Sequence, residues 1–253
     1  MNVRAVLLLL SFALLTGCVT TGDVSPLSTS EGRDAARDAY IQLGIGYLQQ
    51  GNTGRAKAPL SKALDIDSSS ADAHAALALV FQSEMEAELA EEHFRKALSY
   101  RSDDTRIMNN YGSFLFEQKR YAEALEVFTR AAKDTLYPER ASVFENLGLT
   151  ALAMNDRKQA QAYFKRAVRL NVRQSTALLE LSLLTYEDKN YVESKGYYES
   201  YILVSEHNSR SLLLGSRLAS IYEDRDKAAS LGLQLKRLYP VSPEYQQYVL
   251  EQR

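Results

Sequence analysis

Apolar and small residues recur along most of the chain at the three- and four-residue spacing of amphipathic helices. Two successive helical faces are clear near the beginning, with Tyr40, Leu43, Gly44 and Tyr47 on the first and Ala56, Leu60 and Ala63 on the second. The small residues of both faces allow the two helices to approach closely, while Tyr47 and Leu60 fill the space between them. Neither helix is stable alone, so the pattern predicts helices that pack in pairs.

This helix pair returns with a spacing of 34 residues, the period of tetratricopeptide repeats. A two-residue insertion near residues 135–138 shifts the register once, after which the pattern continues. We therefore predict an all-α tetratricopeptide-repeat superhelix of about six helix-turn-helix repeats within residues 35–253. The repeats are expected near residues 37–70, 71–104, 105–138, 141–174, 175–208 and 209–242, followed by one more short helix as a C-terminal cap.

The fifth repeat departs from this pattern. Ser182 and Ser194 are followed by Tyr198 and Tyr201, so that bulk replaces small residues at the sites where the two helices approach. We therefore expect these two helices to lie farther apart than in the other repeats.

The composition is that of a folded chain. Hydrophobic residues make up 45% of the sequence and charged residues 25%, which is the balance of a globular protein. The formal net charge is −2, without a dense basic run, so the electrostatic footprint of a nucleic-acid-binding protein is missing. Nucleic acid is not an expected partner.

The beginning of the chain reads as a signal peptide over residues 1–17, because a short positive start precedes an apolar stretch too short to cross a bilayer. Leu15, Thr16, Gly17 and Cys18 resemble the lipobox of bacterial lipoproteins, which implies acylation of Cys18 as the first residue of the mature chain. Val19, in place of aspartate, favours delivery to the outer membrane, on its periplasmic face. The alternatives are a transmembrane anchor or a secretory signal with a chance cysteine. Residues 18–34 are expected to form a flexible tether.

Residues that carry out chemistry are sparse. His74, His93 and His207 are the only histidines, and none has a partner at the spacing of a helical metal site. His74 occupies the aromatic position of its repeat, which favours packing. We find no phosphate-binding loop and no nucleophile elbow. The sequence predicts no catalytic residue, no metal and no cofactor apart from the lipid on Cys18, and the protein is not expected to be an enzyme.

Binding is the remaining function, and in repeat arrays the first helix of each pair lines a concave groove. The expected lining residues are Ile41, Ile45, Leu48, Leu79, Gln82, Asn109, Ser113, Phe116, Leu149 and Leu152. A clamp for acidic carboxy termini is disfavoured, since this face offers little positive charge except Arg106. The apolar and amide character suits an amphipathic segment laid along the groove. The alternative is that these side chains pack against the neighbouring helix.

The lipobox, the six repeats and several strings together resemble the pilotin lipoproteins of type IV pilus assembly, the PilF/PilW family. These strings lie at residues 40–47, 109–121, 134–148, 210–215 and 223–240. The resemblance implies an outer-membrane lipoprotein that binds the type IV pilus secretin subunit, promotes its localisation and multimerisation, and is required for pilus assembly and twitching motility. An adaptor lipoprotein that recruits cell-wall hydrolases is the alternative. We expect a monomer.

Overall fold

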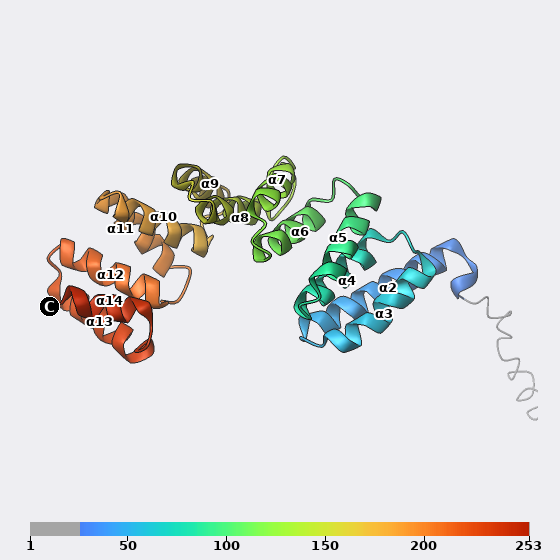
Figure 1. Ribbon diagram of the computed structural model, residues 1–253, viewed down its shortest axis with the longest axis horizontal. Coiled ribbons are helices and arrows are strands. Elements are labelled where there is room, and N and C mark those ends of the chain that lie inside the picture. The colour runs from blue at the N-terminus through green and yellow to red at the C-terminus, as the bar shows by residue number, and fades with distance from the viewer. Residues whose placement is uncertain (1–25, 253) are drawn as a thin grey trace, which may run out of the picture. The chain divides into compact units, whose positions relative to one another are not determined.

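The computed structural model describes residues 26–252, which form one short 3-10 helix and thirteen α-helices but no strand (Figure 1). The all-α tetratricopeptide-repeat class predicted from the sequence is thereby confirmed. The predicted signal peptide and the acylation site Cys18 lie outside the described residues.

Twelve of the helices follow one another as antiparallel pairs, and a thirteenth ends the array (Figure 1). After the 3-10 helix η2 (Pro26–Ser28), the pairs are α2 (Ser30–Gln49) with α3 (Thr53–Ile66), α4 (Ala71–Ser83) with α5 (Ala87–Tyr100), α6 (Thr105–Glu117) with α7 (Tyr121–Ala131), α8 (Arg140–Ala153) with α9 (Arg157–Leu170), α10 (Ser175–Glu187) with α11 (Tyr191–Ile202), and α12 (Ser209–Ile221) with α13 (Arg225–Leu238). The last helix is α14 (Pro243–Glu251).

The turn inside each pair contains one residue with a left-handed backbone. The six residues are Gly51, Met85, Lys119, Asn155, Lys189 and Glu223, with φ between 59° and 72°. This conformation ends the first helix and lets the second one fold back. Only the first turn uses glycine, so the other five accept the steric cost of a side chain there.

The chain divides into two compact units at His93 and Phe94, within α5, and each is described by itself. In the first unit the core is built around Leu60, Leu77 and Val80, with Ile41 in a neighbouring cluster. A Cβ atom added to Gly44 would lie 2.5 Å from Cγ of Leu60, which explains the glycine at this crossing of α2 and α3.

Leu43 differs from its expected role as a packing residue. Its side chain is 48% exposed, whereas Leu77, the equivalent residue one repeat later, is 5% exposed. The reason is positional. Leu77 faces the preceding repeat, and no repeat precedes α2 within the described residues.

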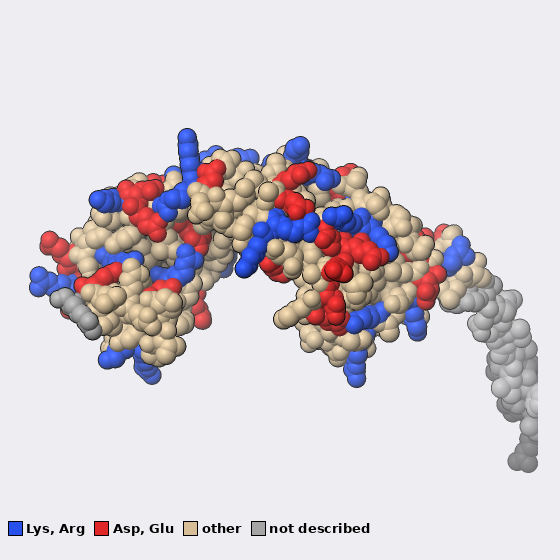
Figure 2. Space-filling model, viewed as in Figure 1, with Lys and Arg blue, Asp and Glu red and all other residues tan. Residues whose placement is uncertain are grey.

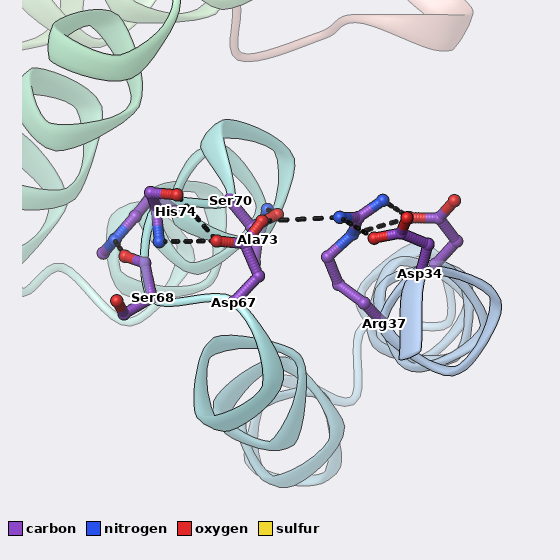
Figure 3. Close-up of polar contacts among 9 residues, drawn as sticks. Asp34, Arg37, Asp67, Ser68, Ser70, Ala73 and His74 are labelled. Carbon is purple, nitrogen blue, oxygen red and sulfur yellow. Dashed lines mark hydrogen bonds and ion pairs between the residues drawn. The ribbon is translucent and has the colours of Figure 1, made fainter. Parts of the chain in front are cut away.

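The helix α2 begins at Ser30, so residues 30–34, which were expected in the flexible tether, are helical. Thr29 caps the helix, because its hydroxyl accepts a hydrogen bond from the Gly32 amide at 3.0 Å. Figure 3 shows Arg37 reaching from α2 to the turn between α3 and α4, where it lies 3.4 Å from Asp67. This ion pair holds the early part of α2 against its own repeat.

In the second unit, repeats three and four pair their helices through a ring over a glycine. Gly112 on α6 faces Phe128 on α7, and an added Cβ would lie 2.6 Å from Cε1 of that ring. Gly148 on α8 faces Phe164 on α9 in the same way, and both rings are fully buried. Because a buried ring has no free space to move into, each notch requires glycine.

Repeat five pairs its helices through serine. The Ser182 hydroxyl donates to the carbonyl of Ser194, and the Ser194 hydroxyl donates to the carbonyl of Ser182, each at 2.7 Å. Both residues are completely buried. The expected wider separation is therefore wrong, because reciprocal bonds to the backbone require the two helices to lie close together.

The predicted C-terminal cap is α14. Ser242 caps it by accepting a hydrogen bond from the Tyr245 amide at 3.1 Å, and Pro243 occupies its first turn. Tyr245 and Tyr248 pack against the last core cluster, which contains Leu212 and Leu235. The helix thus covers the apolar face that repeat six would otherwise expose.

Candidate binding surface on the first helices

In the first unit the predicted groove residues contribute mainly to the core. Ile41 is only 4% exposed, which corrects its assignment to an open groove. Ile45 and Leu48 are half-buried and pack against the core of α3 and α4. Leu79 and Gln82 are half-buried on α4. The alternative interpretation, packing against the neighbouring helix, therefore holds for the three residues of α2.

The second unit contains a pocket of about 210 Å³ on the predicted face. Three of the predicted groove residues line it, namely Ser113 and Phe116 of α6 and Leu149 of α8. The other lining residues are Glu117, Phe128 and Asn146. The structure thus brings together side chains from two successive first helices, with the buried ring of repeat three beneath them.

The pocket combines an apolar floor with an amide wall. Phe116 is held in place by the ring of Tyr121, at 5.3 Å between centroids. Above it, the Asn146 side chain donates a hydrogen bond from Nδ2 to Oδ1 of Asn109 at 3.0 Å. A fourth predicted residue, Asn109, is therefore tied to the pocket.

This amide pair keeps hydrogen-bonding capacity for a ligand. After the bond between them, Nδ2 of Asn109 and Oδ1 of Asn146 have no hydrogen-bond partner within residues 26–252. A peptide group presents one acceptor and one donor, which is the complement of this pair. The site is suited to an extended or helical protein segment with an apolar side chain in the pocket.

Farther along the first helices, polar groups are already used to hold the repeats together. Glu145 of α8 accepts a hydrogen bond from the Ala177 amide at 2.9 Å, and burial raises the pKa of its carboxyl. Glu180 of α10, only 6% exposed, receives two hydrogen bonds from the guanidinium of Arg210 on α12. The predicted residue Leu152 packs on the core of repeat four. These positions are structural rather than open to a ligand.

Sequence reasoning missed Asn146, Glu117 and the role of Glu145. Asn146 was detectable, because it lies three residues before Leu149 and therefore on the same helical face. Glu145 was not, since its partner Ala177 contributes only a backbone amide. No residue type in the sequence marks a backbone donor.

Other chemical sites are not evident in the part of the chain that the structure describes. His74 is 5% exposed, and its Nδ1 lies 3.0 Å from Nδ1 of His93. Within residues 26–252 no cluster of three or more His, Cys, Asp or Glu side chains is arranged to hold a metal ion. None of the described helices has the length and apolar character needed to cross a membrane.

Comparison with known proteins first defines the class. Tetratricopeptide repeat family models match residues 103–171 and 146–206. Together with the paired helices and the pocket on the first helices, they identify a tetratricopeptide-repeat scaffold, which is a fold for protein interaction.

The particular family follows from closer relatives. The type IV pilus assembly protein PilF of Pseudomonas aeruginosa is 59% identical over 251 residues, which cover 99% of this chain and all of that protein. The solved structure of Pseudomonas aeruginosa PilF matches with a TM-score of 0.85 over 87% of this chain and 99% of that one. PilW, a type IV pilus biogenesis factor, is 27% identical with a TM-score of 0.72, over 84% and 98% of the two chains. The chain belongs to the PilF family of type IV pilus biogenesis proteins.

Proposed function

We propose that this protein is an outer-membrane pilotin, acylated at Cys18, that binds the type IV pilus secretin subunit and promotes its localisation and multimerisation in the outer membrane. The observation that carries the proposal is the 59% identity to PilF along essentially the whole chain. The lipobox-like sequence ending at Cys18 supports the lipid anchor. The anchor fixes where the protein goes, and the repeats determine what goes with it.

The pocket between α6 and α8 is the surface that we propose contacts the secretin subunit. Its apolar floor accepts one side chain, and the pair of Asn109 and Asn146 bonds the backbone of the same segment. A secretin segment held this way travels with the lipid anchor to the outer membrane. Loss of the protein then leads to loss of pilus assembly and of twitching motility.

The experiment compares secretin multimers in outer-membrane fractions of cells that carry different variants. Ser113→Arg places a long side chain into the pocket without removing a core residue, and Ser61→Arg, on an exposed position of α3, is the matched control. We expect multimers to be lost with Ser113→Arg and retained with Ser61→Arg. Circular dichroism of both purified variants checks that they remain folded.

The lipid anchor is tested separately with Cys18→Ala. This variant is expected to bind secretin in solution but to leave it outside the outer membrane. Normal secretin multimers in cells without the protein would refute the pilotin function. Copurification of cell-wall hydrolases without secretin would instead favour the adaptor function.

A further inference from the structure

The chain is nearly neutral overall, yet its charge is unbalanced around α9. Residues 157–179 contain no Asp or Glu. The basic residues of this segment are Arg157, Lys158, Lys165, Arg166, Arg169 and Arg173. An uncompensated group of cations on a surface attracts anions.

Two of these cations are neutralised by repeat five. Arg157 pairs with Glu187 at 2.5 Å, and Lys165 pairs with Glu193 at 3.0 Å. Both therefore point along the array toward the next helix pair. Their charges are used to join repeats.

The other four basic residues form a separate surface, here called the basic face: Lys158, Arg166, Arg169 and Arg173. No carboxylate lies within 4.0 Å of their charged groups in the described part of the chain. Arg166 and Arg169 lie 8 and 11 residues after Lys158, which places these three charges on one side of α9, and Arg173 follows in the turn after the helix. In Figure 2, Lys and Arg side chains project from the part of the second unit that holds α9.

An aromatic ring, rather than an acid, supports one end of the basic face. The guanidinium of Arg166 lies 5.8 Å from the centroid of the Phe144 ring, and Arg140 lies 5.4 Å from the same centroid. The pKa of Asp134 is lowered mainly by the hydrogen bond from Thr105 and, to the smallest extent, by the nearby charge of Arg140, so Arg140 is not counted in the face. A ring holds a guanidinium in position while leaving its charge available.

Exposed aliphatic side chains stand between the charges. Leu170, the last residue of α9, is 42% exposed, and Val172, in the turn that follows, is 69% exposed. Both lie between Arg169 and Arg173 in the sequence. The turn has a fixed shape, because Oδ1 of Asn171 accepts a hydrogen bond from the Arg173 amide at 3.0 Å.

The same edge continues into the previous turn. Gln174 donates from Nε2 to the hydroxyl of Ser142 at 3.1 Å, which places the turn after α9 beside the beginning of α8. The turn that leads into α8 carries Leu136, which is 90% exposed. Cations interleaved with exposed aliphatic side chains are the composition of surfaces that lie in the headgroup region of a bilayer.

We propose that the basic face, with Leu170 and Val172, binds the headgroups of anionic phospholipids and so lays the second unit on the membrane surface. The charges meet lipid phosphates, and the two aliphatic side chains reach the boundary between headgroups and acyl chains. This inference rests on the proposed acylation of Cys18, which would hold the repeats close to a bilayer. Its consequence is a fixed orientation of the repeats, in place of free rotation about the anchor.

The test adds the full-length protein, purified from bacterial membranes, to vesicles of phosphatidylcholine, with or without phosphatidylglycerol. The chain has no tryptophan, so Val172→Trp provides a single fluorescent reporter at the turn. Leu233→Trp, at a position on α13 that is 66% exposed, is the matched control. We expect quenching of Val172→Trp by brominated acyl chains only in vesicles with phosphatidylglycerol, and no quenching of Leu233→Trp in either.

Charge reversal tests the cause. Arg169→Glu with Arg173→Glu, made in the Val172→Trp protein, is expected to abolish the quenching, whereas Lys236→Glu with Arg237→Glu changes the net charge equally and leaves it intact. Flotation of the vesicles reports the anchor independently. If the protein floats with both kinds of vesicle but Val172→Trp is quenched no more than Leu233→Trp, the basic face does not bind the membrane. The lipid anchor is not affected by this outcome. Protein that floats with neither overturns the acylation and the basic face together.

Discussion

The two helices of a repeat approach each other closely in repeats three, four and five, but the contact in repeat five is chemically different. In repeats three and four, a glycine on the first helix receives a phenylalanine ring from the second, at Gly112 with Phe128 and Gly148 with Phe164. In repeat five, Ser182 and Ser194 exchange hydrogen bonds with each other's backbone carbonyls. Close approach is achieved by shape in one case and by polar pairing in the other.

Polar groups also join repeat five to repeat six. Repeats five and six are linked by the buried Glu180 with Arg210, and by Tyr198, whose hydroxyl end lies against Gly215. A repeat that looks degenerate by its apolar pattern is therefore not loosely packed. Its stability depends on polar groups that are buried away from water and find their partners within the protein.

The largest expected effect is at the apolar notch. Gly148→Ala places a methyl group against the buried ring of Phe164, so the free energy of unfolding should fall by about 3 kcal/mol. Urea unfolding followed by circular dichroism measures this change. A loss below about 1 kcal/mol would mean that the ring moves aside and that the notch does not require glycine.

The link between repeats five and six should respond next. Arg210→Ala leaves Glu180 buried without its cation. The free energy of unfolding should fall by about 2 kcal/mol, which is less than for a fully buried ion pair because Arg210 is partly exposed. Glu180→Gln combined with Arg210→Ala should recover part of this loss, since no charge is then left buried. Thermal unfolding of the single and double variants compares them.

Within repeat five, Ser182→Ala removes one of the two reciprocal hydrogen bonds and is expected to cost about 1 kcal/mol. A double-mutant cycle with Ser194→Ala measures the coupling between the two serines. Strictly additive effects would contradict a shared role in holding the helices together.

A smaller change of opposite sign is expected at Gly196 on α11. A Cβ atom added to this glycine would have no neighbouring atom within 4 Å. Gly196→Ala should raise the free energy of unfolding by roughly 0.5 kcal/mol through helix propensity. This variant is the control for Gly148→Ala, because it makes the same substitution in a helix without a partner ring. Destabilisation here would indicate an unrecognised contact.

The smallest effect concerns pH. Burial raises the pKa of Glu145 in the folded chain, so the folded state holds this proton more tightly than the unfolded chain does. The corresponding stability is fully present below the unfolded pKa and is lost as pH rises through the folded pKa. Glu145→Gln keeps an acceptor for the Ala177 amide, and its advantage over the natural chain should grow from acidic to neutral pH. Urea unfolding at several pH values measures it, and a constant difference would refute the assignment.

Part of the pocket could be predicted from the sequence, because the repeats place its residues at a regular spacing. Ser113 and Leu149 hold equivalent positions of successive repeats, and Phe116 lies one turn after Ser113 on the same helix, so three of the six residues that line the pocket were predicted from this spacing. Ile41 was predicted as groove and proved to be core, because both kinds of residue lie on neighbouring parts of the same helix. Spacing along one helix identifies a face, but it does not say how far the next helix covers it.

By itself the sequence determined the all-α class, the paired helices and the tetratricopeptide period, since these depend on local propensity and on the repetition of small and large residues. Only the tertiary structure decided that Leu43 is left open, that Ser182 and Ser194 close a repeat, and that Asn146 completes a pocket. It also separated the cations of α9 that join repeats from those that face outward. The physical reason is that burial and pairing belong to contacts between helices, and those contacts exist only after the chain has folded.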